Sequence, residues 1–170
     1  MRSIVSFVCL AFLWALPAAP ADLSKLKPWT GHATPKLALK DLDGKLRDLS
    51  QYRGKVVVLN FWATWCAPCI KEMPSLQRLA QKLPPARFAL LTVNFGESEQ
   101  QISPFLDQLG MRFPVLLDRD MKASNAWVDK GLPTTYVIDA DQKIRYRVLG
   151  DLEWDAPEVE ARIRELLPKG

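Results

Sequence analysis

The sequence predicts an α/β fold in which a mixed central sheet is covered by helices on both faces. Two nearly continuous apolar runs, at residues 56–59 and 88–95, are typical of strands that are buried on both faces. Apolar residues at helical spacing follow the first run, and strand and helix patterns then alternate along the chain. Two more strand patterns, at residues 134–138 and 144–148, flank a polar turn, which predicts a closing antiparallel hairpin.

The composition is that of one globular domain. The chain has 170 residues, of which 48% are hydrophobic and 25% are charged, so it can bury a sizeable core. The net charge is +4, and the basic residues are scattered among acidic ones rather than gathered in a run. We therefore expect no nucleic-acid partner. No dimerisation segment is evident, so we expect a monomer.

The first 21 residues have the pattern of an export signal. Arg2 precedes an apolar stretch at residues 4–16, and Ala19 and Ala21 supply the small residues for cleavage after Ala21. Residues 3–21 carry no charge and are also long enough to serve as an uncleaved membrane anchor, and this alternative stays open. In both cases the folded part is exported, which predicts a periplasmic protein. Cys9 lies in the leader and is expected to have no role in the mature chain.

Residues 22–35 form a polar, proline-containing approach that we expect to be loosely held. It contains the only histidine, His32, which in such a loop is expected to be solvated rather than to bind a metal. The folded domain is predicted to span residues 36–168. It opens with a hairpin whose turn contains Gly44, followed by one capped helical turn at residues 49–54.

Cys66 and Cys69 lie where the strand at residues 56–59 gives way to a helix predicted over residues 66–82. Their spacing places both sulfurs on one side of the first helical turn, close enough to form a disulfide. The amides and the positive dipole end of that helix favour the thiolate of Cys66, the form that attacks disulfides. A structural disulfide across so short a loop would add little stability. The pair is therefore predicted to be redox-active.

The remaining elements follow in chain order. Pro74 lies inside the helix at residues 66–82 and is expected to kink it. Ser98 and Gln101 have capping-box spacing for a second helix. The other predicted elements are a helix ending near residue 109, a strand over residues 113–117, a short helix over 121–128 and a last helix over about 155–167.

Three motifs resemble a known family. The run that ends in the two cysteines, Phe61-Trp62-Ala63-Thr64-Trp65-Cys66-Ala67-Pro68-Cys69, resembles the redox site of the thioredoxin fold. The run Gly131-Leu132-Pro133-Thr134-Thr135 resembles the cis-proline loop of that fold. The pattern made by Cys69, Glu72 and Pro74 resembles the exported TlpA/ResA/CcmG-like thiol-disulfide reductases. The resemblance extends over residues 36–167 and implies a thioredoxin-like fold with an N-terminal hairpin and an extra strand–helix insertion.

The resemblance implies roles for the matching residues. Cys66 would be the nucleophile that forms a mixed disulfide with a client, and Cys69 would be the resolving thiol that releases the reduced client. Pro133 would be cis and would let the backbone of Leu132 pair with the client chain. Trp65 is expected to pack beside the dithiol and shield it. Trp62 is expected either to do the same or to lie in the core, and both readings stay open.

Glu72 lies three residues after Cys69, so both can lie on one face of the helix. A partly desolvated carboxylate there can accept the proton of Cys69 when the mixed disulfide resolves. The alternative is an exposed helix glutamate. Thioredoxin has a buried acid on its central strand where this chain has Asn60, which cannot take up a proton. Glu72 is therefore the predicted proton acceptor.

The residue before the second cysteine predicts the direction of electron flow. It is Pro68, as in thioredoxin, whereas strong oxidants of the DsbA type carry histidine there, so we expect a reductase. The resemblance implies apocytochrome c or copper-site assembly proteins as clients, a membrane electron donor of the DsbD or CcdA type, and no cofactor. Two alternatives remain: a Cu(I)-binding copper-delivery module that uses both thiolates, and a thiol oxidase or isomerase.

Overall fold

A computed structural model describes residues 21–169, so nearly all of the expected leader lies outside the described residues. A six-stranded sheet has the strand order β1-β8-β7-β4-β5-β6, and β2 and β3 form a separate hairpin. The strands are β1 (Lys27–Pro28), β2 (Ala38–Lys40), β3 (Leu46–Asp48), β4 (Val56–Trp62), β5 (Phe88–Phe95), β6 (Val115–Asp118), β7 (Thr134–Ile138) and β8 (Ile144–Leu149). The helices are α1 (Ala67–Lys82), α2 (Glu99–Leu109), α3 (Lys122–Trp127) and α4 (Pro157–Arg164), with short 3-10 helices η1 (Leu23–Lys25) and η2 (Leu49–Tyr52).

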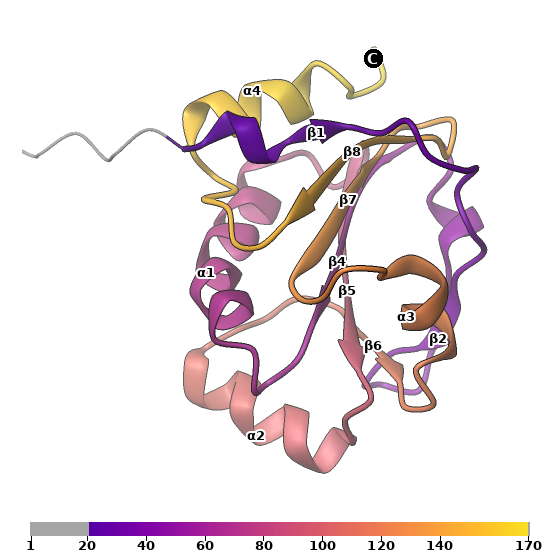
Figure 1. The fold of residues 1–170 in the computed structure, drawn as a ribbon, viewed down its shortest axis with the longest axis vertical. Coiled ribbons are helices and arrows are strands. Elements are labelled where there is room, and N and C mark those ends of the chain that lie inside the picture. The colour runs from indigo at the N-terminus through magenta and orange to yellow at the C-terminus, as the bar shows by residue number, and fades with distance from the viewer. Residues whose placement is uncertain (1–20, 170) are drawn as a thin grey trace, which may run out of the picture.

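β4 lies in the middle of the sheet and is buried along its whole length. It runs parallel to β5 and antiparallel to β7, which confirms the predicted mixed sheet. Alternate residues of β4 face opposite layers. Val56 and Val58 pack in one apolar cluster with residues of α1 and α4, whereas Val57 and Leu59 pack in another that includes Trp127 of α3. Figure 1 shows α1 and α3 on opposite sides of the sheet.

The predicted hairpins are both present. β2 and β3 pair antiparallel around a turn in which Gly44 has a φ of 76°, a conformation that glycine adopts without strain. β7 and β8 pair antiparallel and close the sheet. The parallel strand at residues 88–95 is also confirmed, with the bounds that the apolar run predicts.

The approach at residues 22–35 differs from the loosely held segment that the sequence predicts. Lys27 and Pro28 pair with β8 as an edge strand, Leu26 is buried, and the ring of Trp29 meets Tyr136 edge-on at 5.6 Å. Pro28 fits an edge strand because it has no amide to donate to a further neighbour. Since β8 would otherwise end the sheet with its backbone unpaired, the approach covers part of that edge.

Most helix boundaries agree with the sequence to within a few residues. α1 begins directly after Cys66 and continues through Pro74, and α2 begins at Glu99 with Ser98 and Gln101 forming the predicted capping box. α4 is shorter than predicted and begins at Pro157, a first-turn position that suits proline. None of the helices within residues 21–169 combines the length and apolar composition that crossing a bilayer requires.

Candidate active site

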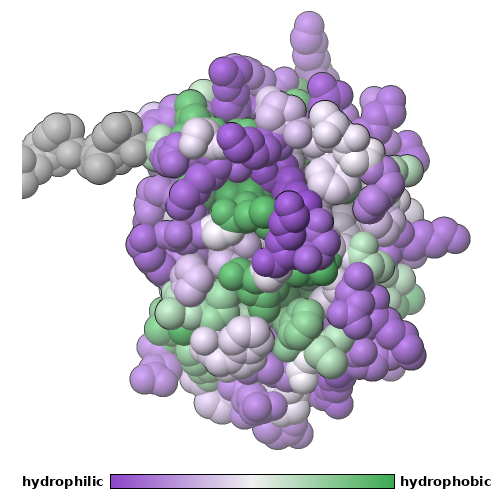
Figure 2. Space-filling model, in the orientation of Figure 1, coloured by the Kyte–Doolittle hydropathy of each residue, from purple (hydrophilic) through white to green (hydrophobic). Residues whose placement is uncertain are grey.

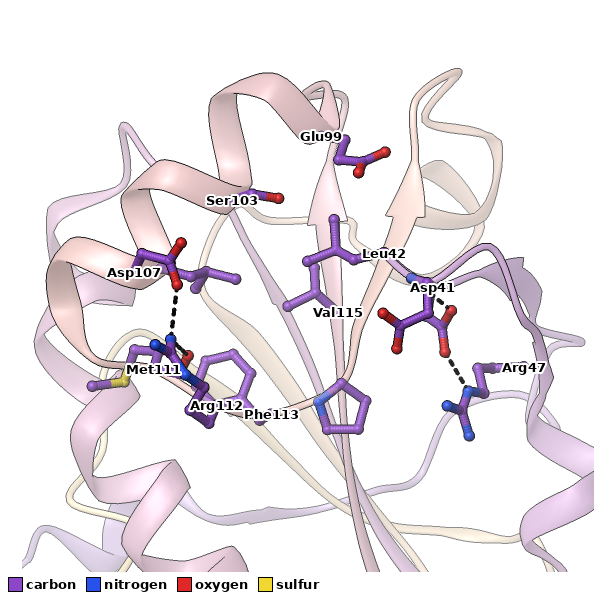
Figure 3. A pocket seen from close by; sticks show the side chains of 13 residues that line it. Asp41, Leu42, Arg47, Glu99, Ser103, Asp107, Met111, Arg112, Phe113 and Val115 are labelled. Atoms are coloured by element: carbon purple, nitrogen blue, oxygen red, sulfur yellow. Dashed lines mark hydrogen bonds and ion pairs between the residues drawn. The ribbon is translucent and has the colours of Figure 1, made fainter.

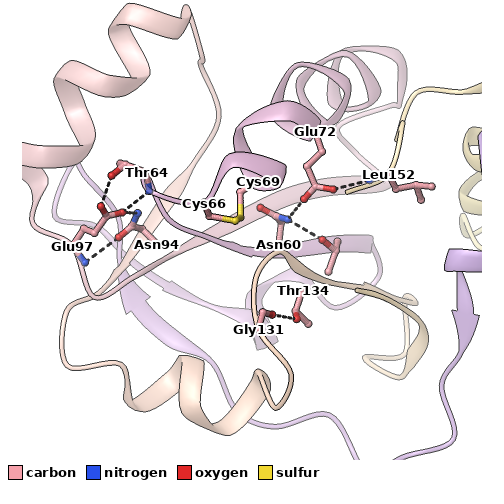
Figure 4. The surroundings of a disulfide bond; sticks show 11 residues. Asn60, Thr64, Cys66, Cys69, Glu72, Asn94, Glu97, Gly131, Thr134 and Leu152 are labelled. Atoms are coloured by element: carbon pink, nitrogen blue, oxygen red, sulfur yellow. Dashed lines mark hydrogen bonds between the residues drawn. A yellow bond between two sulfur atoms is a disulfide. The ribbon is translucent and has the colours of Figure 1, made fainter. Parts of the chain in front are cut away.

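Cys66 and Cys69 are joined by a disulfide, with their Cα atoms 5.3 Å apart (Figure 4). Cys66 is the N-cap residue of α1, and Cys69 lies in the first turn. β4 ends at Trp62, so the chain needs only a short turn to bring the cysteines to one end of the sheet. Pro68 occupies a first-turn position, where its missing amide costs no helical hydrogen bond. This placement is the one that the sequence predicts.

The two cysteines are buried in an apolar cluster of the core. Cys66 is 5% exposed and Cys69 is 1% exposed, in an apolar cluster that also holds Trp62 and Met73. Trp62 is fully buried and thus belongs to the core beside the dithiol. Trp65 lies in the turn between β4 and α1 and is 67% exposed, so it is not part of that buried cluster. Its packing beside the dithiol stays a prediction.

The peptide bond between Leu132 and Pro133 is cis, as the resemblance implies. The loop that contains it leads into β7, whose first residue, Thr134, pairs with Phe61 near the end of β4. The hydroxyl of Thr134 donates to the carbonyl of Gly131 at 2.6 Å and so ties the loop together. Leu132 packs against the apolar cluster that contains both cysteines. The loop therefore lies at the same end of the sheet as the disulfide (Figure 4).

Glu72 is 1% exposed, which rules out the alternative of an exposed helix glutamate. Three N–H groups donate to its carboxylate. Asn60 Nδ2 lies 2.8 Å from Oε1, the backbone amide of Leu152 lies 3.1 Å from Oε2, and Trp154 Nε1 lies 2.8 Å from Oε2. These donors come from β4 and from the segment after β8. Glu72 is thus held between the central strand and the chain that follows the closing hairpin.

Burial raises the pKa of Glu72 to about 8, because a charged carboxylate loses its hydration there. The hydrogen bonds from Trp154, Leu152 and Asn60 act in the opposite direction, and the nearby charge of Asp151 raises the pKa further. A carboxyl group with this pKa can bind or release a proton near neutral pH. This is the property that general acid–base chemistry requires.

Sequence reasoning missed another buried carboxylate near the dithiol, that of Glu97. Glu97 is 7% exposed, and its Oε2 accepts from the backbone amide of Thr64 at 2.8 Å and from Asn94 Nδ2 at 2.7 Å. The hydroxyl of Thr64 donates to Oε1. These bonds tie the end of β5 to the turn before Cys66 (Figure 4). The signal that was available is a polar residue near the end of a buried strand, Asn94, followed three residues later by Glu97 in the loop after that strand.

A large hollow lies elsewhere on the described part of the chain. It has a volume of about 630 Å³ between the β2–β3 hairpin, the start of β6 and one face of α2 (Figure 3). Four of the charged side chains that line it form two ion pairs, Arg47 with Asp41 at 2.6 Å and Arg112 with Asp107 at 3.1 Å, and the carboxylates of Asp43 and Glu99 also line it. Since neither cysteine lines this hollow, it is separate from the redox pair.

Apolar side chains also gather on the surface. Figure 2 shows them at the centre of one face, surrounded by hydrophilic residues. Leu149, at the end of β8, is 41% exposed, and it pairs with Thr134, which directly follows Pro133. Within residues 21–169 no group of three or more His, Cys, Asp or Glu side chains is arranged to hold a metal ion.

Comparison with known proteins identifies the family. A match to the AhpC/TSA family covers residues 30–147. The chain is 35% identical over 152 residues to the thiol-disulfide oxidoreductase ResA of Geobacillus thermodenitrificans, which covers 89% of this chain and 87% of that one. It is 37% identical over 122 residues to ResA of Bacillus subtilis, which covers 72% and 68%. A structure assigned as the thiol:disulfide interchange protein DsbE from Chlorobium tepidum aligns with a TM-score of 0.73 and 28% identity, over 82% of this chain and 99% of that one. The chain therefore belongs to the AhpC/TSA family, has the thioredoxin-like fold, and is a thiol-disulfide oxidoreductase.

Proposed function

We propose that this protein is an exported reductase that uses Cys66 and Cys69 to reduce disulfides in client proteins of the periplasm. The observation that carries the proposal is the disulfide at the start of α1 with the buried carboxyl group of Glu72 on the same helix. Export is supported by the leader pattern of residues 1–21. The reducing direction is supported by Pro68 between the cysteines.

The reaction begins with both cysteines reduced. The thiolate of Cys66 attacks a client disulfide, forms a mixed disulfide and displaces one client sulfur as a thiolate. Cys69 then gives its proton to the carboxylate of Glu72 and attacks the sulfur of Cys66. The Cys66–Cys69 bond forms, the mixed disulfide breaks, and the second client sulfur leaves. Two electrons have passed to the client, and the displaced client thiolates take up protons.

The surface beside the dithiol suits an extended client segment. Trp65 offers a large exposed ring next to Cys66, and the Leu132–Pro133 loop lies at the same end of the sheet. The backbone of Leu132 would pair with the client chain, and Trp65 would contact client side chains. From the resemblance, the clients would be apocytochrome c or copper-site assembly proteins. A membrane donor of the DsbD or CcdA type would reduce the Cys66–Cys69 disulfide again, and the protein would act as a monomer.

Trapping tests this proposal. The Cys69→Ala variant keeps the nucleophile but cannot resolve a mixed disulfide, so clients should accumulate on Cys66 in intact cells. Non-reducing electrophoresis followed by mass spectrometry would identify them. The double variant Cys66→Ala/Cys69→Ala is the control and should trap none. Equal amounts of adduct with the single and the double variant would reject the proposal.

A Cu(I)-binding module is the second candidate. The observation that favours it is that Met73 and Met111 belong to the same buried cluster as the two cysteines. Thiolates and thioethers are the soft ligands that Cu(I) prefers. Cu(I) titration of the reduced protein, beside an insulin-reduction assay, separates the two functions. Tight Cu(I) binding without insulin reduction would favour this candidate over the reductase.

A further inference from the structure

We propose that Trp154 is a positioning residue that directs the transferred proton to one particular oxygen of Glu72, namely Oε1, on the side of Asn60 and the dithiol. The inference rests on the proposed function, since it assumes that Glu72 takes the proton of Cys69. The proposal gives a role to Trp154, which lies 82 positions after Glu72 in the chain and forms no hydrogen bond with Cys66 or Cys69.

The hydrogen bonds of the carboxylate are distributed unequally. Oε2 accepts two N–H groups, from Trp154 at 2.8 Å and from Leu152 at 3.1 Å, whereas Oε1 accepts only one, from Asn60 at 2.8 Å. Each carboxylate oxygen has two acceptor positions. Those of Oε2 are therefore filled, while Oε1 keeps one for a proton. In Figure 4, Oε2 points toward Leu152, and the oxygen bonded to Asn60 lies on the side of the disulfide.

Trp154 is suited to hold this arrangement because its position is determined from both ends. Its side chain is fully buried, and its backbone amide donates to Ser75 Oγ at 3.0 Å. Ser75 Oγ in turn donates to the carbonyl of Glu72 at 2.7 Å. An indole N–H can only donate, so Trp154 cannot rotate to accept a proton from Glu72 as an amide or hydroxyl could. The carboxyl plane is thereby held with Oε2 toward Trp154.

The three N–H donors to the Glu72 carboxylate are all neutral, so within residues 21–169 no charged side chain orients it in place of Trp154. The side chains near Glu72 from β4 and β7 are Asn60 and Thr135, and both are neutral. Asn60 Nδ2 donates to Glu72 Oε1 and to Thr135 Oγ1, each at 2.8 Å. From the segment after β8, Asp151 is the nearby charge, and it is itself paired with Lys71 at 2.5 Å and Lys25 at 3.4 Å. Among the groups that favour the carboxylate form of Glu72, the hydrogen bond from Trp154 is the strongest.

The test compares two buried tryptophans. Trp154→Phe removes the indole donor but keeps most of the apolar volume, so the pKa of Glu72 should rise by about one pH unit. The pH profile for resolution of a mixed disulfide should move in the same direction by a similar amount. Trp127→Phe is the matched control, because Trp127 is buried against the opposite face of the sheet and should leave both quantities unchanged. Carbon NMR of labelled Glu72 measures the pKa directly.

A measurement on the unchanged sequence guards against a variant that fails to fold. In the oxidised protein, the chemical shift of the Trp154 indole N–H should change as the pH is raised through the pKa of Glu72. In Glu72→Gln it should stay constant over the same pH range. A constant resonance in the unchanged protein, or an unaltered Glu72 pKa in Trp154→Phe, would overturn the inference. The role of Glu72 as proton acceptor fails if Glu72→Gln resolves mixed disulfides with the same rate and pH profile as the unchanged protein. The proposed reductase function fails separately, if Cys69→Ala traps no more adduct than the double variant.

Discussion

Two of the buried carboxylates in the described residues, those of Glu72 and Asp41, have opposite properties. Glu72 on α1 is 1% exposed, and Asp41 in the turn after β2 is 4% exposed. Each accepts three hydrogen bonds. Those of Asp41 come from the backbone amides of Asp43 and Lys45, at 3.1 and 2.8 Å, and from Arg47 Nε at 2.6 Å. Burial acts to raise the pKa of both groups, yet the pKa of Asp41 is lowered whereas that of Glu72 rises to about 8.

The two groups differ in how deeply they lie in the protein and in the charge of one donor: Asp41 lines an open hollow, whereas Glu72 lies inside the core. Arg47 is a cation, and its hydrogen bond and charge outweigh the burial of Asp41 together with the two amides. All three donors of Glu72 are neutral, so burial prevails. Asp41 is therefore a permanent anion that holds the β2–β3 hairpin together, whereas Glu72 can exchange a proton. Low exposure and three hydrogen bonds thus do not fix the pKa of a carboxyl group, because its depth in the protein and the charge of its donors also act.

The largest effect is expected at the dithiol that Glu72 serves. Cys66→Ser should lower insulin reduction more than about 1,000-fold, because no other thiolate can begin the exchange. Arg47→Met, which disturbs the other carboxylate, should leave the rate within about twofold. A turbidity assay at neutral pH measures both. Comparable losses in the two variants would remove the functional distinction between the two regions.

Glu72→Gln should change how stability depends on pH. Because the pKa of Glu72 is raised by folding, its contribution to stability is fully present below its ordinary value of 4.5 and is lost as the pH rises through about 8. The variant has no carboxyl group to ionise, so this decline should disappear. The difference should reach a few kcal/mol at pH 9. Urea unfolding of the oxidised forms at pH 5, 7 and 9 measures it, and parallel curves would contradict the prediction.

Arg47→Met tests the second carboxylate of the comparison, Asp41, by removing its cationic partner. Removing the cation leaves Asp41 buried with two amide donors, so the pKa of Asp41 should rise and the protein should lose about 1–3 kcal/mol of stability at pH 7. Thermal or urea unfolding measures the loss. The double variant Asp41→Asn/Arg47→Met should recover part of it, because no buried charge then lacks a cation. If Arg47→Met were as stable as the unchanged protein, the cation would not be the deciding donor.

A smaller effect is expected for a carboxylate nearer the surface. Hydrogen bonds from Arg78 hold the pKa of Asp155 down to about 2. The resulting stability is present above the ordinary pKa of 3.8 and is lost as the pH falls through about 2. Arg78 is half exposed, so Arg78→Gln should cost only about 1 kcal/mol at pH 6. Unfolding at pH 6 and pH 2.5 measures this, and an equal cost at both values would contradict the assignment.

The sequence predicted the fold because its signals are local. The apolar runs of β4 and β5, the helical spacing after Cys69 and the turn between β7 and β8 each report on their own segment. The position of the two cysteines could be predicted because the apolar pattern changes there from that of a buried strand to helical spacing. Glu72 could be predicted to lie near Cys69 because both are on α1.

The remaining features depend on contacts between distant segments. Nothing local shows that Trp154 meets Glu72, or that Lys27 and Pro28 pair with β8. The sequence left the place of Trp62 open, and the structure puts it in the buried cluster around the sulfurs together with Met73. Periodicity predicts which face of an element is buried, but it does not identify the donor that a buried polar group meets.

The central claim is that Cys66 and Cys69 open and close to pass electrons to clients. Equilibrating the pair with dithiothreitol or glutathione redox buffers, and measuring the fraction of reduced cysteines by alkylation, tests it most directly. We predict reversible opening with a reduction potential near that of thioredoxin, about −270 mV. A disulfide that stays closed throughout, or a potential near the value of about −120 mV found for the oxidant DsbA, would contradict it.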